Sequence, residues 1–385
     1  MTKKSKSTDQ EPRRPLPAWF SEAGLGIFIH WGPFAIPAFA PVPEPGVSFP
    51  DLLRVDPRHM GERMPYSEWY RNAMTIEGSP TATHHRRVWN DAPYEDFQAM
   101  FESGLDNWDP GVWADLFRQS GAKYVVMVTK HHDGYCLWPT EQRHPNRPGW
   151  FSKRDMVGEL AVAVRERGMR FGVYYSTGLD WSFNHFPIRE IVDAVGCTPR
   201  SDEYLRYMSG QLEELIQRYE PSVLWADIGT QPGFEVTDFK ERLLARIPDA
   251  VINDRWDHPV PGTGSKLGRM IWNNLFALVI PRSKPKPFYP GRHAAADFRT
   301  AEYSVPDAPT SYAWEATRGM GSGFGFNAEE TDAHRIDPDE LVQMYRDVRS
   351  AGGNMLLNVG PLADGTISEA EALRLRRLGE SISGT

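Results

Sequence analysis

A carboxylate at the end of a short apolar strand is the first candidate for chemistry in this chain. In residues 223–228, VLWADI, every second side chain is apolar, which leaves Trp225 and Asp227 together on the opposite face. The side chains of a barrel strand alternate between the surrounding helices and the barrel interior. Asp227 would then point inward at the strand end where barrel active sites lie. We interpret it as a catalytic candidate, with a turn-capping aspartate as the alternative.

The same alternation places polar side chains on the inward faces of three other strands. Tyr174 points inward from FGVYYS, His30 follows Phe28 on one face of GIFIH, and Arg255 ends the inward face of VINDRW. An arginine at a strand end can orient a carboxylate through paired hydrogen bonds. A lone histidine or arginine is more often a satisfied structural group, so these residues predict a site only if they meet at one end of a barrel.

Two adjacent histidines, His131 and His132, lie next to Asp133 and raise the question of a metal. Neighbouring residues on a strand point in opposite directions, and no pair has the i, i+4 helical spacing of a zinc protease. We therefore expect the imidazoles to bind sugar hydroxyls, and no metal. The glycine-rich residues 319–323, GMGSG, lack the strand and acidic partner of a dinucleotide site and predict a tight barrel loop. No cofactor is predicted.

A barrel that cleaves glycosides needs a second carboxyl group, because the scissile bond must be flanked by a nucleophile and an acid. Glu302 in DFRTAEY and Glu315 in SYAWEATRGMG are the two candidates. A retaining enzyme holds its two carboxyl groups about 5 to 5.5 Å apart. The sequence leaves open which glutamate meets that distance from Asp227.

Short apolar runs alternate with amphipathic stretches along the chain, which predicts an α/β fold. Buried stripes or terminal glycines predict helices over residues 156–168, 205–219 and 338–353. We expect one domain, an imperfect (β/α)8-like TIM barrel. The predicted strands are Leu25 to Trp31, Tyr124 to Thr129, Met169 to Ser176, Val223 to Ile228, Val251 to Trp256 and Asn354 to Gly360.

Irregular segments divide the rest of the chain. We expect residues 1–17 to be a polar N-terminal tail and residues 18–385 to be one (β/α)8-like domain that carries the catalytic candidates. Residues 257–296 read as a long loop insertion over the barrel mouth, and the proline-rich residues 41–64 read as a second loop. Either segment could shape access to a site.

Composition limits the partners and the location. The chain has 385 residues, 40% of them hydrophobic and 24% charged, and a net charge of -8, which disfavours nucleic acid and anionic membranes. The two cysteines are too few for a disulfide scaffold. Neither a secretory signal nor an apolar run of about 20 residues is present, so we expect a cytoplasmic protein without a membrane partner. Its oligomeric state is not predicted.

Taken together, long ordered motifs resemble the α-L-fucosidases of glycoside hydrolase family 29. The similarity runs from about Ala18 to Glu369 and ends soon before the terminus at Thr385, where many members continue into a β-sandwich. The expected protein is therefore the catalytic domain alone. The motifs are AWFSEAGLGIFIHWG, YSEWY, GAKYVVMVTKHHDGYCLWPT, FGVYYSTGLDW, VLWADIG, VINDRW, FRTAEY, WEATRGMGSGFGFN and GGNMLLNVGPLADGTI.

The resemblance implies a (β/α)8-like barrel that hydrolyses terminal α-L-fucosides with retention, through a covalent fucosyl-enzyme and without metal or cofactor. It places the nucleophile at Asp227 and the acid/base at Glu302, with Glu315 as the alternate. Phe28, Tyr66 and Phe324 match the pocket for the C6 methyl group of fucose. The positions that match fucose contacts are His30, Glu68, Trp69, His131, His132, Tyr174, Trp225 and Arg255.

Two rival functions remain open at this stage. One is a metal-dependent barrel hydrolase built on His30, His131, His132 and Asp227. The other is a fucose-binding barrel without turnover, which would not need a nucleophile and two further glutamates. The linkage, the aglycone and the physiological glycan are not encoded in any motif.

Overall fold

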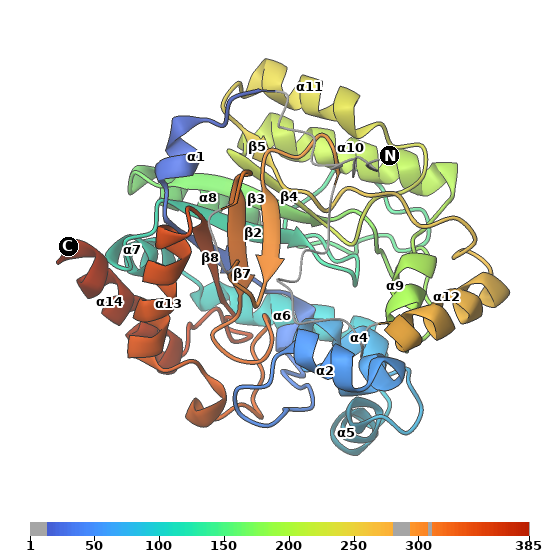
Figure 1. The fold of residues 1–385 in the computed structure, drawn as a ribbon. Coiled ribbons are helices and arrows are strands. Elements are labelled where there is room, and N and C mark those ends of the chain that lie inside the picture. The colour runs from blue at the N-terminus through green and yellow to red at the C-terminus, as the bar shows by residue number, and fades with distance from the viewer. Residues whose placement is uncertain (1–13, 280–292, 307–309, 385) are drawn as a thin grey trace, which may run out of the picture.

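Eight parallel strands form one curled sheet in the computed structural model, which describes residues 14–279, 293–306 and 310–384. The strand order is β5-β4-β3-β2-β1-β8-β7-β6, and helices pack around the sheet (Figure 1). This is the barrel-like α/β arrangement that the alternating pattern predicts. The strands are β1 Leu25–Ile29, β2 Tyr124–Lys130, β3 Arg170–Ser176, β4 Val223–Asp227, β5 Val251–Ile252, β6 Arg299–Glu302, β7 Trp314–Arg318 and β8 Asn354–Val359.

All six predicted strands are present, although β5 keeps only two of the six residues expected there. The sequence analysis did not identify β6 and β7, which contain the two candidate glutamates. Both are short and lack the apolar alternation of the other strands. The segments FRTAEY and SYAWEATRGMG were therefore recognised by their carboxylates and not as strands.

The barrel is imperfect because its edge strands β5 and β6 do not pair along a ladder. Hydrogen bonds at Asp297 and Asp254 bridge the gap instead. The Asp297 amide donates to the Ile252 carbonyl at 2.9 Å, and the Ile252 amide donates to the Asp297 carboxylate at 2.9 Å. The Thr300 amide donates to Asp254 Oδ1 at 3.1 Å. These contacts bring the long connection from β5 back to β6 at the barrel wall.

The predicted alternation of side chains is confirmed on the central strands. Leu224 and Ala226 pack in the large cluster between sheet and helices, whereas Trp225 lies in the cluster inside the barrel. Tyr174 and Phe28 share that interior cluster. Inward side chains at the carboxyl ends of the strands therefore meet around the barrel axis.

Helices complete the βα units and cover the outer face of the sheet (Figure 1). Helix α10, Asp202–Tyr219, is capped by Ser201, whose hydroxyl accepts from the Tyr204 amide at 3.2 Å, and it buries its apolar stripe from Tyr204 to Tyr219. The α-helices are α1 Ala18–Glu22, α2 Phe49–Val55, α3 Met60–Arg63, α4 Tyr70–Ala73, α5 Pro80–Trp89, α6 Phe97–Gly104, α7 Pro110–Gln119, α8 Met156–Glu166, α9 Ile191–Gly196, α10 Asp202–Tyr219, α11 Val236–Arg246, α12 Lys266–Val279, α13 Pro338–Ser350 and α14 Glu369–Ser383. The short 3-10 helices are η1 Pro33–Ala35, η2 Pro57–His59, η3 Ser67–Trp69, η4 Tyr94–Asp96, η5 Leu105–Asn107 and η7 Asp332–His334.

Two segments expected to be loops contain helices, and that part of the prediction was wrong. Residues 257–296 contain α12, and residues 280–292 of the same segment lie outside the described residues. Residues 41–64 contain α2, η2 and α3. Prolines and glycines at the ends of these segments obscured the short helices between them. Among the described helices, none has both the length and the apolar character needed to cross a bilayer.

Candidate active site

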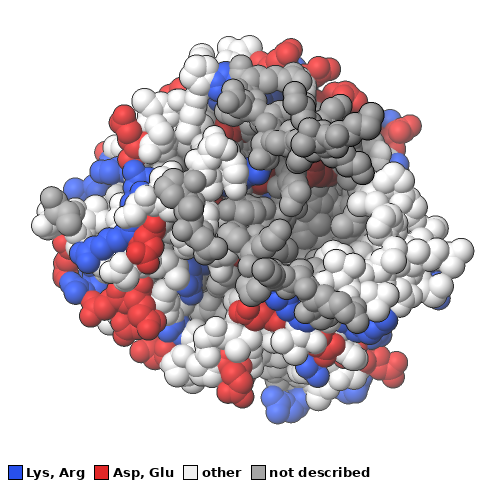
Figure 2. All heavy atoms as spheres, viewed as in Figure 1, with Lys and Arg blue, Asp and Glu red and all other residues white. Residues whose placement is uncertain are grey.

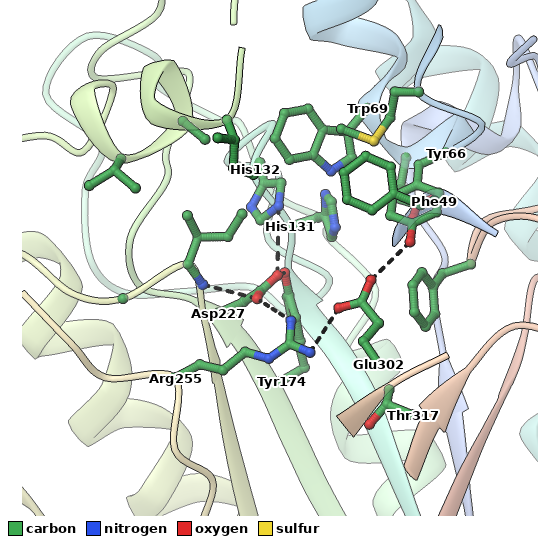
Figure 3. A pocket seen from close by; sticks show the side chains of 18 of the residues that line it. Phe49, Tyr66, Trp69, His131, His132, Tyr174, Asp227, Arg255, Glu302 and Thr317 are labelled. Carbon is green, nitrogen blue, oxygen red and sulfur yellow. Dashed lines mark hydrogen bonds and ion pairs between the residues drawn. The ribbon is translucent and has the colours of Figure 1, made fainter. Parts of the chain in front are cut away.

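A cavity of about 430 Å³ opens at the carboxyl ends of the strands. Its wall contains thirteen of the fourteen residues singled out by the sequence, and the exception is Glu315. Figure 3 shows Asp227, Arg255 and Glu302 on one side of this cavity, facing His131, His132 and Trp69. Residues separated by more than two hundred positions thus converge on one space.

Asp227 lies at the last position of β4, where the chain turns sharply through Ile228 and Gly229, both at positive φ. Its Oδ2 accepts a hydrogen bond from the Tyr174 hydroxyl at 2.9 Å, and its Oδ1 receives Arg255 Nη1 at 3.0 Å. Burial alone would raise the pKa of Asp227, but Arg255, His132 and Tyr174 outweigh it and hold that pKa below its ordinary value. The side chain is a buried, ionised carboxylate.

Arg255 connects two acidic residues of the cavity wall, Asp227 and Glu302. Its Nη1 binds Asp227, its Nη2 binds Glu302 Oε2 at 2.9 Å, and its Nε donates to Thr300 at 3.0 Å. The guanidinium also lies over the Trp225 ring, with its central carbon 4.5 Å from the ring centroid. A planar fork held at this many points fixes both carboxylates on one side of the cavity.

Glu302 ends β6 and is buried, with 6% of its surface exposed. Besides the contact with Arg255, its Oε1 accepts from the Tyr66 hydroxyl at 2.9 Å. Tyr66 comes from the segment before β2, and β6 comes after the long insertion. The insertion therefore does not move Glu302 away from the cavity.

Glu315 lies deeper in the barrel and does not line the cavity. Its Oε2 accepts from the Tyr124 hydroxyl at 2.5 Å and its Oε1 accepts from the Trp225 indole at 3.1 Å. Burial raises the pKa of Glu315 to about 7, against the opposing effect of these two hydrogen bonds. Gly26 makes room for the Tyr124 ring, because a Cβ at Gly26 would lie 2.3 Å from a ring carbon. Glu315 therefore holds the Trp225 indole from the interior side of the barrel, away from the cavity.

Two of the histidines have their tautomers fixed by neighbouring groups. The Ser176 hydroxyl donates to the Leu179 carbonyl at 2.6 Å, so it accepts from His132 Nδ1 at 2.7 Å. The Asn358 amide donates to the Phe324 carbonyl, so its oxygen accepts from His30 Nδ1 at 2.6 Å. Each ring therefore presents an unprotonated Nε2.

Burial lowers the pKa of His30 to about 3 and that of His132 to about 4, so both rings are neutral near pH 7. His132 Nε2 lies 3.7 Å from Asp227 Oδ2, which is too long for a direct hydrogen bond. The two acceptors are suited to hydroxyl groups of a ligand. His131 stacks on Tyr174 with ring centroids 5.7 Å apart, and its Nδ1 has no partner in the described chain.

An apolar corner and a further carboxyl group, that of Glu68, complete the predicted site. Phe324 packs edge-on to Tyr66 at 5.4 Å and to Phe28 at 6.5 Å, and all three line the cavity. Glu68 accepts from the Gly325 amide at 2.8 Å, and burial raises its pKa to about 7. Trp69 packs edge-on against His132 at 5.2 Å. The corner can take a methyl group, whereas Glu68 can bind a hydroxyl.

The sequence analysis missed most of the cavity's outer rim. These residues include apolar side chains of the two segments expected to be loops, Asp257 and His258 at the start of the second segment, Thr317 on β7, and Ile191, Ala194 and Val195 on α9. A periodic apolar pattern in those segments would have been the only clue, and it is too short to read. The apolar rim side chains from the two segments are Phe49, Met60, Met64, Pro259, Val260 and Phe276.

Within the described ranges, no group of three or more His, Cys, Asp or Glu side chains has the arrangement of metal ligands. His131 and His132 lie with ring centroids 4.0 Å apart, but His132 bonds Ser176 and His131 stacks on Tyr174. Their contacts are those of hydrogen-bonding and packing residues.

Comparisons with known proteins agree with this geometry. A family model described as Alpha-L-fucosidase matches residues 1–271 and 281–383. The alpha-L-fucosidase of Dictyostelium discoideum is 30% identical over 97% of this chain and 71% of its own, and the plasma alpha-L-fucosidase of Homo sapiens is 31% identical over 95% and 67%. The crystal structure of Thermotoga maritima alpha-fucosidase in complex with fucose is 38% identical, with a TM-score of 0.75, over 95% of this chain and 73% of that chain.

Proposed function

The chain belongs to the α-L-fucosidase family of glycoside hydrolases, and we propose that it is a retaining, exo-acting α-L-fucosidase that works through a covalent fucosyl-enzyme. One observation carries the retaining mechanism: a single guanidinium, Arg255, spans the gap between the carboxylates of Asp227 and Glu302. Arg255 contacts the two carboxyl groups at 3.0 and 2.9 Å. A gap that one guanidinium can span suits direct attack by one of these carboxyl groups rather than attack by an intervening water.

In the first step, Asp227 attacks the anomeric carbon. A new bond forms between that carbon and a carboxylate oxygen while the glycosidic bond breaks, and Glu302 gives its proton to the departing oxygen. Asp227 suits the role because its pKa is held low, so the nucleophile is ionised without an extra base. Tyr174 and Arg255 fix the direction of its oxygens.

In the second step, Glu302 takes a proton from water as that water attacks the same carbon and releases Asp227. The two inversions return the original configuration. Tyr66 orients Glu302 through the hydroxyl that donates to its Oε1. Arg255 balances the charge that passes between the two carboxyl groups during the cycle.

Recognition of the sugar uses the remaining wall. The unprotonated Nε2 atoms of His30 and His132 accept hydrogen bonds from hydroxyl groups, and Trp225 and Tyr174 supply apolar surface. Phe28, Tyr66 and Phe324 enclose the C6 methyl group of fucose. The deep end of the cavity is filled by interior side chains, so only a terminal sugar can enter, as exo action requires.

The test is the anomer released first from an aryl α-L-fucoside, followed by NMR before mutarotation. We expect α-L-fucose. Initial release of β-L-fucose would contradict the retaining mechanism, and the absence of hydrolysis of any α-L-fucoside would contradict the catalytic assignment. Activity should be measured on fucosylated oligosaccharides beside the aryl substrate, because they define the aglycone that the rim accepts.

A further inference from the structure

Arg255 lies beyond the strand that leads to it, because the ladder between β4 and β5 stops three residues earlier. Side chains of the two preceding residues take the place of that ladder. Asn253 accepts from the Ala226 amide at 2.9 Å and donates to the Ala226 carbonyl at 2.8 Å. On the other side, Asp254 Oδ1 accepts from the Thr300 amide of β6 at 3.1 Å. Side-chain contacts, and not the sheet itself, therefore decide where Arg255 lies.

The Thr300 hydroxyl joins Asp254 to Arg255, and the chemistry of these two partners fixes its direction. Arg255 Nε is a donor only, so the Thr300 oxygen accepts from it at 3.0 Å. The hydroxyl hydrogen then goes to Asp254 Oδ1, which lies 2.9 Å away. One hydroxyl thus relates the position of a carboxylate to that of the guanidinium.

These three residues are buried, unlike most charged side chains of the protein. Figure 2 shows Lys and Arg side chains lying among Asp and Glu side chains on the outer surface, where water and salt screen their charges. Arg255 is 7% exposed, Asp254 is 1% exposed and Thr300 is 0% exposed. In such surroundings a hydrogen bond is stronger than in water, and no solvent replaces a partner that is lost. The contact through Thr300 therefore has a strong effect on the orientation of Arg255.

The Thr300 contact differs from the other hydrogen bonds of Arg255 because its partner takes no part in the reaction. Nη1 and Nη2 bind the carboxyl groups of Asp227 and Glu302 (Figure 3). In the proposed cycle, Asp227 loses its charge when the fucosyl-enzyme forms, and Glu302 becomes an anion as its proton leaves. The two Nη contacts therefore change in strength during each turnover, whereas the Nε contact keeps the same partner.

Stacking alone does not orient the guanidinium in this way. Its central carbon lies 4.5 Å from the centroid of the Trp225 ring. An aromatic face attracts a cation with little dependence on where the individual N–H groups point. A hydrogen bond weakens steeply as its angle departs from linear, so the Nε contact adds the direction that stacking lacks.

We propose that Thr300, oriented by Asp254, is a positioning residue that holds the plane of Arg255 and so keeps the carboxyl groups of Asp227 and Glu302 in their reactive directions. Its role in turnover rests on the proposed function. Neither Thr300 nor Asp254 lines the cavity. Both therefore act through Arg255 and not on the sugar.

A loosened Arg255 should be detectable at Asp227. Burial would raise the pKa of Asp227, and the groups facing it that hold the pKa below its ordinary value are Arg255, His132 after β2 and Tyr174 on β3. His30 after β1 also interacts with Asp227, and that ring is neutral near pH 7. Without the Nε contact, the effect of Arg255 should weaken and the pKa of Asp227 should rise.

Thr300→Val removes the hydroxyl, keeps the shape of the side chain and leaves the backbone amide for Asp254. We expect kcat/KM on an aryl α-L-fucoside to fall about tenfold or more, and the acid limb of its pH profile to move upward by about half a pH unit or more. Thr300→Ser restores the hydroxyl and should bring both values back near those of the unmodified chain. If Thr300→Val does not fold, Thr300→Ala removes the same hydroxyl from a smaller side chain.

The matched control is Thr140→Val, which removes another buried hydroxyl that lies between a carboxylate and an N–H donor. Thr140 Oγ1 donates to Glu214 Oε2 at 2.7 Å and accepts from the Gln142 amide at 3.1 Å, and none of these residues lines the cavity. Thr140→Val should lower Tm to a similar extent as Thr300→Val, but it should leave the rate and the acid limb unchanged. A purely structural role for Thr300 would make the two variants alike.

Three results would overturn the proposal. These are an unchanged rate and acid limb in Thr300→Val, the same shift in Thr140→Val, and a Thr300→Ser protein that behaves like Thr300→Val. NMR titration of labelled carboxyl carbons, with Asp227 assigned through Asp227→Asn, gives the pKa of Asp227 without turnover, and it should be higher in Thr300→Val. If the unmodified chain hydrolyses no α-L-fucoside but this difference in pKa is found, the proposed function alone fails.

Discussion

Two successive layers of side chains inside the barrel each contain a glutamate, and they place it in opposite environments. In the register of β6 and β7, Thr300 lies beside Glu315 in the inner layer, and Glu302 lies beside Thr317 in the layer at the mouth. Glu302 contacts a guanidinium and faces the cavity. Glu315 contacts only neutral donors, Tyr124 and Trp225, among its hydrogen-bond partners, and has no access to the cavity.

This difference teaches that depth along the barrel, and not residue type, separates chemistry from support. The charge of Asp227 at the mouth is balanced by Arg255, and its pKa lies below the ordinary value. The pKa of Glu315 is raised to about 7 because burial acts without a facing cation of comparable effect. Asp227 is available as an ion in the mouth layer, whereas Glu315 is a hydrogen-bonded support in the inner layer.

Replacing the mouth-layer nucleophile should produce the largest effect. Asp227→Gly should lower kcat on an aryl α-L-fucoside by a factor on the order of 10^5 or more, because the covalent step loses its attacking group. Azide should restore part of the rate and yield a β-L-fucosyl azide, since it enters the vacated space from the same face.

The control for this change is Asp115→Asn, which removes a surface carboxylate paired with Arg167 at 2.8 Å. Its rate should match that of the unmodified chain. An Asp227→Gly protein that keeps a rate near the unmodified value would exclude Asp227 as the nucleophile.

Replacing the acid/base should give the second largest effect, and the size of that effect depends on the substrate. Glu302→Ala should lower kcat/KM by about 10^2 to 10^4 on a natural fucoside with a poor leaving group, and by much less on an aryl fucoside that needs little protonation. Tyr66 loses one acceptor in this variant, but Arg255 keeps its contact with Asp227. The measurement is the ratio of kcat/KM on the two substrates. If Glu315→Gln gives that dependence and Glu302→Ala only raises KM, the two layers have exchanged roles.

The apolar corner of the mouth layer should give a third, smaller effect. An α-L-galactoside carries a hydroxyl at C6 that would be buried among Phe28, Tyr66 and Phe324, at a cost of about 1 to 3 kcal/mol, or roughly 5- to 150-fold in kcat/KM. Phe324→Ser should reduce this discrimination, whereas Phe276→Ala at the outer rim should leave it unchanged. Equal kcat/KM values for the two sugars in the unmodified chain would contradict the enclosed pocket.

Much of the site could be predicted because strand alternation and strand ends have direct sequence patterns. Apolar residues at every second position of β4 identify Trp225 and Asp227 as inward, and the structure places both on the cavity wall. The motifs of the family resemblance add Glu68, His131 and Phe324, which alternation alone does not reach. Their approach depends on loops that join distant parts of the chain.

The remaining features have no local pattern. The depth of Glu315 depends on its register with β6 and on the space left by Gly26 for Tyr124, and both are tertiary facts. The closure between β5 and β6 uses side chains of Asp254 and Asp297 in place of a ladder. Helix α12 escaped prediction because its apolar residues face outward, so no core-facing stripe was expected beside so many prolines and glycines.

Changing Glu315 in the inner layer should alter how the stability of the protein depends on pH, and should leave turnover unchanged. The ordinary pKa of a glutamate, 4.5, applies to the unfolded chain, and Glu315 titrates at about 7 in the folded protein. The folded state therefore binds more protons between these values, so this group's stabilising contribution is complete below pH 4.5 and is lost as the pH rises through about 7. Glu315→Gln cannot titrate, and its side chain retains hydrogen-bonding atoms for Tyr124 and Trp225.

The difference in Tm between Glu315→Gln and the unmodified protein should thus rise by about 2 to 4 °C from pH 4.5 to above 7, since other buried groups titrate equally in both proteins. Scanning calorimetry at several pH values measures it, and Glu380→Gln on α14 controls for the loss of one negative charge. The leaving-group dependence of kcat/KM should stay that of the unmodified chain, because Glu315 has no path to the glycosidic oxygen. A Tm difference that is constant with pH would mean that Glu315 is as ionised in the inner layer as it is in water. The distinction between the two layers would then have to rest on access to the cavity alone.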